Sequence, residues 1–268
     1  MDDKKSTGDL LGLAPYGEAI NTLSKGIVAG AGAFLSKICL PAAEEFGLLL
    51  LDRVHAWRTR NVVDVLSRAE QILNSTRPNE DLQAHPRLVY SIIDQGSWTD
   101  TGELKNMWAG LLAASCCKDG RDDGNLIFTN ILSQLSAPQA RLLNFCCQKT
   151  KKKLLKSGLL LSHGITLSQH ELIEITGVSD IHRLDREMDH LRSLGLIEGG
   201  FPGSGADKQL AAAIVPLSLA LQLYAKFQGI ADPIEKFYGM APVEKSGVLG
   251  KLLKKPLRSF ERRGNNCE

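Results

Sequence analysis

The stretch that decides the fold is Asp180–Pro216, which reads DIHRLDREMDHLRSLGLIEGGFPGSGADKQLAAAIVP. Its first part carries apolar residues at helical spacing, namely Ile181, Leu184, Met188 and Leu191. This spacing predicts an amphipathic helix, and Gly195 ends it. Two short apolar runs follow, at 196–198 and 209–215, with a glycine-rich tip between them, so they predict a β-hairpin.

Two helices precede this stretch. Ser136-Ala-Pro-Gln139 and Ser168-Gln-His-Glu171 each have the pattern of a capping box, in which a serine and the residue three positions later bond to each other's backbone. The first box predicts a helix that runs into Lys149, and the second predicts a short helix that Gly177 closes. Three helices followed by a hairpin is the order of elements in a winged helix, a variant of the helix-turn-helix. A final helix is predicted from Pro216 to about 229.

The amino-terminal part of the sequence is predicted to be helical as well. Its helices are expected at 26–39, 41–73 and 86–95, with a fourth that opens at the capping pattern Asp100-x-x-Glu103. Leucine, with 42 residues against 26 for isoleucine and valine together, also favours helix over sheet. The predicted fold class is therefore mainly α, with an amino-terminal helical domain followed by a winged-helix module with one small β-hairpin. The predicted boundaries are a flexible arm at 1–24, the helical domain at 25–130, the winged-helix domain at 131–230 and a basic amphipathic tail at 231–268.

Charge is spread unevenly along the chain. Hydrophobic residues make up 43% of it and charged residues 23%, which excludes a mostly disordered or fibrous protein. The net charge of +2 disfavours a surface coated with basic residues for nucleic-acid binding. Residues 245–268 hold seven basic and two acidic residues, a net charge of +5, which leaves −3 for residues 1–244. The question of partners therefore falls on a few segments.

A dense lysine run follows the first helix of the predicted winged-helix module, and it consists of Lys149, Lys151, Lys152, Lys153 and Lys156. Two interpretations stay open, namely solvated charges or contact with a nucleic-acid backbone or an acidic partner. The third helix of the module, at 180–192, has four acidic and three basic residues, which suits neither phosphates nor a major groove. We therefore favour a protein partner or self-association for this module, and nucleic acid less.

The tail carries a second candidate contact, formed by Lys251, Lys254, Lys255 and Arg258 with Leu252 and Leu253. Such interleaving of basic and apolar residues is typical of segments that lie on an anionic membrane surface or dock into a partner's groove. Pro256 would interrupt a helix, and a disordered tail is the alternative.

The sequence predicts no catalytic residue, no cofactor and no metal. It has no G-x-x-x-x-G-K-[ST] phosphate loop, no H-E-x-x-H and no G-x-S-x-G. Its cysteine pairs, at 116–117 and 146–147, are adjacent on predicted helices, whereas metal knuckles place other residues between their cysteines, so buried reduced thiols are the favoured interpretation. Core packing is predicted for Trp57 and Trp108. Surface or capping positions are predicted for His163, His170, His182 and His190.

No secretory signal is predicted, because the charged first residues have no apolar core beside them. The protein is therefore expected in the cytoplasm. Peripheral attachment to the inner membrane stays open as an alternative. The longest apolar stretch, at 26–51, is interrupted by Lys37, Pro41, Glu44 and Glu45. It is not expected to cross a bilayer unaided.

Three motifs in this order resemble those of the bacterial abortive infection alpha (Abi-alpha) family. The first is Pro41-Ala-Ala-Glu-Glu-Phe-Gly47, continued by Asp52, Val54 and Trp57-Arg58. The second is Asp100-Thr-Gly-Glu-Leu104 with Met107-Trp-Ala-Gly-Leu-Leu-Ala113, and the third is Ile131-Leu-Ser-Gln-Leu-Ser136 with Ala140 and Leu143. The resemblance covers about residues 25–225 and implies a cytoplasmic protein of phage defence by abortive infection. It implies no catalytic residues and does not extend to the basic tail.

Three hypotheses of function follow. The first is a non-enzymatic protein that serves phage defence through protein–protein association. The second is a membrane-acting toxin, in which the helix at 26–39 and the tail permeabilise the inner membrane when triggered. The third is a winged-helix DNA-binding regulator, which the acidic third helix disfavours.

Overall fold

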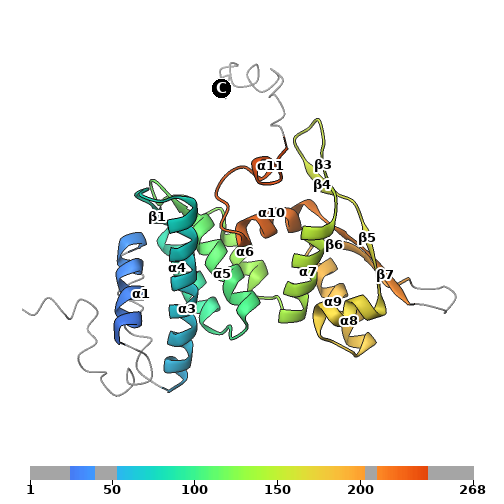
Figure 1. The fold of residues 1–268 in the computed structure, drawn as a ribbon, viewed down its shortest axis with the longest axis horizontal. Helices are drawn as coiled ribbons and strands as arrows, with labels where there is room; N and C mark the ends of the chain where they lie inside the picture. Colours follow the sequence, from blue (N-terminus) through green and yellow to red (C-terminus); the bar gives the residue numbers. More distant parts are fainter. Residues whose placement is uncertain (1–24, 40–52, 203–209, 241–268) are drawn as a thin grey trace, which may run out of the picture.

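Helices dominate the computed structural model, which describes residues 25–39, 53–202 and 210–240 (Figure 1). The amino-terminal helices are α1 (Lys25–Ile38), α3 (Arg53–Thr76), α4 (Pro86–Ser97), α5 (Gly102–Ser115) and α6 (Leu126–Leu132). A short antiparallel pair, β1 (Gln83–Ala84) and β2 (Cys116–Cys117), joins the segments before α4 and after α5. The helices predicted at 26–39 and 86–95 are confirmed. The helix predicted at 41–73 is confirmed from Arg53 onward, and its beginning lies outside the described residues.

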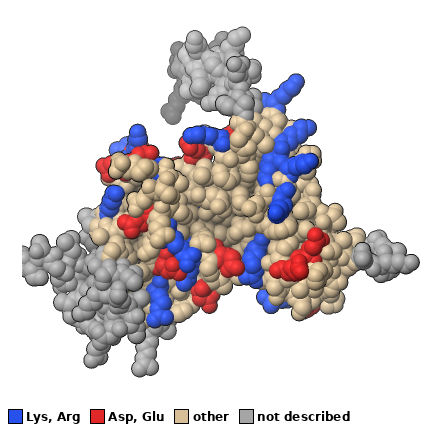
Figure 2. Space-filling model, viewed as in Figure 1, with Lys and Arg blue, Asp and Glu red and all other residues tan. Residues whose placement is uncertain are grey.

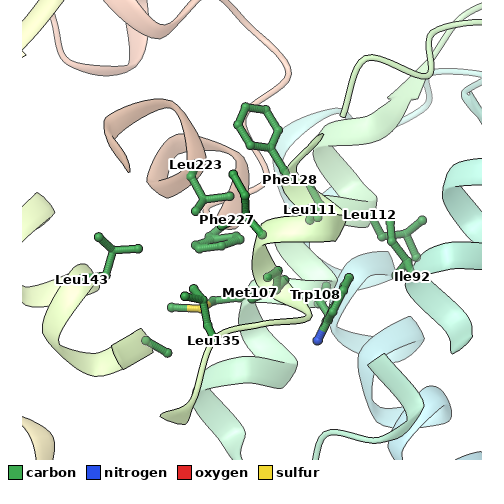
Figure 3. Packing of buried hydrophobic residues seen from close by; sticks show 14 of the residues in the cluster. Ile92, Met107, Trp108, Leu111, Leu112, Phe128, Leu135, Leu143, Leu223 and Phe227 are labelled. Carbon is green, nitrogen blue, oxygen red and sulfur yellow. The ribbon is translucent and has the colours of Figure 1, made fainter. Parts of the chain in front are cut away.

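Helix α5 forms the centre of the amino-terminal half. All of its residues from Met107 to Ser115 are buried, and Trp108 is among the largest fully buried side chains. Trp108 packs on α4, where a Cβ atom added to Gly96 would lie 3.3 Å from its side chain. In Figure 3, Ile92 lies on the Trp108 side of α5, and Met107 lies on the side of Phe227. Because α5 is rich in alanine and glycine, α3, α4 and α10 (Ser218–Phe227) can pack closely around it. The core position predicted for Trp108 is confirmed.

Helix α1 packs on α3, outside this centre. Four of its apolar side chains are almost completely buried, namely Ala31, Phe34, Leu35 and Ile38. These are the side chains that a membrane-acting toxin would place in the bilayer, and here they belong to the hydrophobic core.

In the carboxyl-terminal half, three helices pack with a small sheet. The helices are α7 (Ala137–Lys149), α8 (Gln169–Thr176) and α9 (Ile181–Ser193). Strands β5 (Ile165–Ser168), β7 (Ala211–Pro216) and β6 (Ile197–Gly200) form an antiparallel sheet in that order. The predicted hairpin is therefore present as β6 and β7, and β5 adds a strand that the sequence did not predict.

A second hairpin lies between α7 and β5. It is formed by β3 (Lys152–Leu154) and β4 (Leu160–Ser162), in the segment interpreted from sequence as a charge run. A strand is recognised in sequence when polar and apolar residues alternate. The runs of consecutive lysines and consecutive leucines in this segment do not alternate, so the sequence did not predict the strands. After β7 the chain continues through α10 to the short helix α11 (Ile234–Phe237).

Two helix starts are confirmed in detail and two predictions are wrong. Ser136 and Ser168 each form both bonds of a capping box, and Gly177 ends α8 in the left-handed conformation. Helix α5, in contrast, has Thr101 as its N-cap, so Glu103 stands too early in the helix to reach back to Asp100. Its carboxylate lies 3.5 Å from Arg141 of α7 instead. The other wrong prediction is Pro216, which ends β7 instead of opening α10.

Helix α5 approaches the end of α10 closely. A Cβ atom added to Gly110 would lie 1.8 Å from the carbonyl oxygen of Phe227. Since α10 also packs on α7 and β4, this contact connects the amino-terminal helices to the carboxyl-terminal half. The buried side chains of the two halves form one continuous cluster.

Substitution of Gly110 by alanine is expected to destabilise the fold by roughly 3 kcal/mol, because the clash is with a backbone oxygen that no side-chain rotation can relieve. Urea unfolding followed by circular dichroism measures the change. Gly102→Ala on the same helix is the matched control, since a Cβ there meets nothing within 4 Å. Equal stability of the two variants would contradict the close contact.

The two kinds of helix start give a second prediction. Ser168→Ala removes the side chain that accepts from the Glu171 backbone N–H, and should lower the unfolding free energy by about 1 kcal/mol. Asp100→Ala should change it by less than about 0.5 kcal/mol, because Asp100 is exposed and does not cap α5. The same unfolding measurement compares them, and a larger loss for Asp100→Ala would show that the cap lies where the sequence predicted it.

Candidate functional site

The lysine run forms the outer side of the β3–β4 hairpin and the end of α7. Lys149, Lys151, Lys153 and Lys156 are exposed, and we call these four residues the lysine cluster. Figure 2 shows basic side chains gathered over the place where Figure 1 puts this hairpin. Among the residues that the structure describes, none of the four forms an ion pair with a carboxylate.

Lys152 differs from its neighbours because it points to the opposite face of β3. Its ammonium group donates to the carbonyl oxygens of Thr150 at 2.6 Å and of Gln148 at 3.2 Å, at the carboxyl end of α7. It also lies 5.4 Å from the ring centre of Tyr238, just after α11. Partial burial lowers the pKa of Lys152. Lys152 therefore stabilises the helix end and the base of the hairpin.

Two leucines accompany the lysine cluster. Leu159 is 47% exposed and Leu161 is 37% exposed, although both are large apolar residues. Leu161 pairs directly with Lys153 across the hairpin, so the two side chains share one face. Sequence reasoning did not single out these leucines, because only the pairing of β3 with β4 shows which of the consecutive leucines point outward.

Two arginines of helix α9 form ion pairs with acidic residues of the same helix. Arg183 lies 3.4 Å from Glu187, and Arg192 pairs with Asp189 and donates to the Gly199 carbonyl oxygen. Ser136, at the start of α7, also donates to the Glu187 carboxylate at 2.8 Å. The predicted recognition helix thus uses most of its charges within the molecule.

A second exposed surface lies on α3 and α4. Trp57 and Trp98 are 38% and 54% exposed, with ring centres 6.2 Å apart, and Tyr90 of α4 is also exposed. We call Trp57 and Trp98 the aromatic patch. The core position predicted for Trp57 is wrong, because Trp57 lies near the beginning of α3, where its ring packs against exposed Trp98 instead of α5.

Arg58 holds the aromatic patch in place. Its guanidinium lies 4.4 Å from the ring centre of Trp98 and 2.8 Å from the Asp94 carboxylate. It also donates to the Ser97 hydroxyl at 2.8 Å, while the Asn61 side chain donates to the Ser97 carbonyl oxygen at 2.9 Å. These contacts hold the Trp98 ring and the end of α4 against α3.

The cysteines are placed largely as predicted. Cys39, Cys116, Cys146 and Cys147 are buried, and burial raises the pKa of Cys116 and of Cys146 to about 12. Cys116 and Cys117 lie in β2, however, and not on a helix, because the chain turns into an extended conformation at the end of α5. Within residues 25–39, 53–202 and 210–240, no group of histidine, cysteine and acidic side chains could hold a metal ion.

The histidines lie at the surface or next to helix ends. His170 and His182 are exposed, and His163 is exposed beside β4. His190 is partly buried, with its Nδ1 atom 2.9 Å from the Gln139 side-chain nitrogen. Gln139 belongs to the capping box of α7, so His190 helps to join α9 to that helix start.

A model of the abortive infection alpha family matches residues 60–215. The chain belongs to the abortive infection alpha family. The match contains the second and third motifs singled out in the sequence and begins after the first. It includes the β3–β4 hairpin, α9 and Trp98, while α1, α10 and α11 lie outside it. No curated protein and no solved structure matches the chain.

Membership of the abortive infection alpha family points to phage defence. In the part of the chain that the structure describes, no helix combines the length and the apolar character needed to cross a membrane. The tail contact predicted at Lys251, Lys254, Lys255, Arg258, Leu252 and Leu253 lies outside the described residues.

Thiol labelling tests the burial of the cysteines in this family member. In a Cys267→Ser variant at about pH 8, iodoacetamide should modify Cys117 first, because the thiolate reacts and the buried thiols Cys116 and Cys146 stay protonated. Mass spectrometry of the peptides measures the order, and labelling in urea is the control for full access. Early modification of Cys146 in the folded protein would contradict this packing.

Proposed function

We propose that this protein serves phage defence in the bacterial cytoplasm by binding a protein partner or a second copy of itself, without catalysing a reaction. The observation that carries the proposal is the aromatic patch. Tryptophan and arginine are among the residue types that dominate the binding energy of protein interfaces, and here two tryptophans and Arg58 stand together at the surface.

The fixed geometry of the patch supports the same conclusion. The rotamer of Trp98 is limited by its contacts with Arg58 and with Trp57. Binding to a surface that is already ordered loses less side-chain entropy, so more of the contact energy appears as affinity. An exposed tryptophan adds less to the stability of the isolated chain than a buried one, because much of its ring stays in water.

We further propose that residues 131–230 form a winged-helix module, next to a helical domain at 25–130. The supporting observation is the order of α7, α8 and α9 followed by the β6–β7 hairpin, with β5 completing the sheet. The β3–β4 hairpin is an insertion into this order, between α7 and β5.

Protein contact fits this module better than DNA contact does. The arginines Arg183 and Arg192 of α9 are paired with acidic side chains of the same helix, which leaves little positive charge to meet phosphates. The lysine cluster begins at the other end of α7, about 20 Å from the α9 contact at Ser136. The two regions therefore do not form one basic surface.

The absence of catalysis is part of the same proposal. It is supported by the burial of the thiols that could act as nucleophiles, since a neutral thiol is a weak nucleophile. It is also supported by the pairing of charges around the hollow beside α3, of about 640 Å³, where Asp64 meets Arg68 and Lys105.

Substitution of Trp98 by alanine tests the proposal. We expect loss of protection against phage, measured as efficiency of plating, and roughly 30-fold weaker affinity for the partner, as for other interface tryptophans. The partner is identified by a photo-crosslinking amino acid placed at Tyr90 in infected cells, and its affinity is measured by calorimetry.

Ile127→Ala is the matched control, because Ile127 is 51% exposed but lies on α6, outside the aromatic patch. Both variants are checked by thermal unfolding, since Trp98→Ala also removes ring contacts worth about 1 kcal/mol. Full protection by a folded Trp98→Ala variant would refute the role of the patch.

A further inference from the structure

The β3–β4 hairpin has one face fixed to the protein and one face free. On the fixed face, Leu160 is only 2% exposed, and the Ser162 hydroxyl donates to the Pro216 carbonyl oxygen at 2.6 Å. Lys152 holds the same face to the end of α7. The outer face is therefore presented in a defined orientation.

The outer face combines positive charge with exposed apolar side chains. Residues 149–163 contain five lysines and no aspartate or glutamate, and four of these lysines form the exposed cluster. Leu161 stands opposite Lys153, and Leu159 lies at the turn end of β4 beside Leu160. Contact with a partner would remove the apolar surface of the leucines from water, and the lysines would favour a partner with negative charge.

An anionic lipid surface satisfies both kinds of side chain. Lysines meet the phosphate groups of the lipids, while short apolar side chains enter the boundary between headgroups and acyl chains. A nucleic acid satisfies only the lysines, and residues 149–163 hold no Phe, Tyr or Trp on which bases could stack. The pattern therefore favours lipid over nucleic acid.

We propose that the lysine cluster, with Leu159 and Leu161, is a docking surface for an anionic membrane. The end of the described chain supports this assignment. Tyr238 lies against Lys152 at the base of the hairpin, and the chain leaves the described part at Met240, before the segment 245–268 with its net charge of +5. The sequence that follows the described part thus begins next to the base of the hairpin and is basic.

The surface is separate from the aromatic patch, and the two proposals can fail independently. In Figure 1 the helices α3 and α4, which carry the patch, and the β3–β4 hairpin lie on different sides of the molecule. Protein binding through the patch and membrane binding through the hairpin therefore do not exclude each other.

Co-sedimentation of the full chain with lipid vesicles tests the docking surface. One vesicle type is phosphatidylcholine alone, and the other contains roughly one third phosphatidylglycerol. We expect binding to the anionic vesicles only, weakened as salt rises. The triple variant Lys151→Gln, Lys153→Gln, Lys156→Gln should bind roughly 100-fold more weakly, at about fivefold per lysine. Leu159→Ser with Leu161→Ser should also weaken binding, and this loss should persist at high salt.

The matched control is the triple variant Arg60→Gln, Lys118→Gln, Arg186→Gln, which removes the same charge from exposed positions elsewhere. It should bind the anionic vesicles nearly as the unchanged protein does. All the replaced residues are exposed, and thermal unfolding verifies that each variant is folded.

Three results would overturn the proposal. The first is equal vesicle binding by the hairpin and control triple variants. The second is loss of binding on replacement of Lys251, Lys254, Lys255 and Arg258 by glutamine, with no effect of the hairpin variants, which would assign the contact to the tail alone. The third is absence of vesicle binding together with hairpin-dependent binding of single-stranded or duplex DNA, which would identify the partner as nucleic acid.

Discussion

The contact between Gly110 and the Phe227 carbonyl oxygen determines how the two halves of the chain fit together. It lets α10 lie directly on α5, and α10 in turn supports α7 and β4. The orientation of the β3–β4 hairpin, and with it that of the lysine cluster, depends on this support. A single glycine in a helix of mostly small residues therefore positions a surface that is far away in the sequence.

Helix α7 separates two regions of different electrostatic character. At its start, Ser136 and Gln139 bind the charged side chain and the backbone of Glu187, within a network of paired groups. At its end, the Lys152 ammonium group donates to two carbonyl oxygens, and the neighbouring lysine side chains are exposed. Among the described residues, charge is neutralised where these helices pack on each other and is left without ion pairs on the exposed face of the hairpin.

The sequence predicts those features that depend on neighbours a few residues apart. Both serine capping boxes, the apolar face of α9 and the glycines that end α8 and α9 follow from local spacing and from backbone conformations that favour glycine. The outward position of Trp57 and Leu161 does not, because the exposure of a side chain is decided by elements that arrive from elsewhere in the chain. Asp100 shows the same limit at short range, since a shift of one residue in the helix start moves Glu103 out of reach.

The alternation of side chains in β3 limits how the length of this segment can vary in evolution. Lys151 and Lys153 face outward only while Lys152 occupies the inward position against Tyr238. Deleting one residue between α7 and β3 would exchange the two sets and turn two cations towards the protein, whereas a change of two residues would keep the outer face basic. Among homologues that keep this surface, insertions and deletions at the entry to the hairpin should therefore come in even numbers.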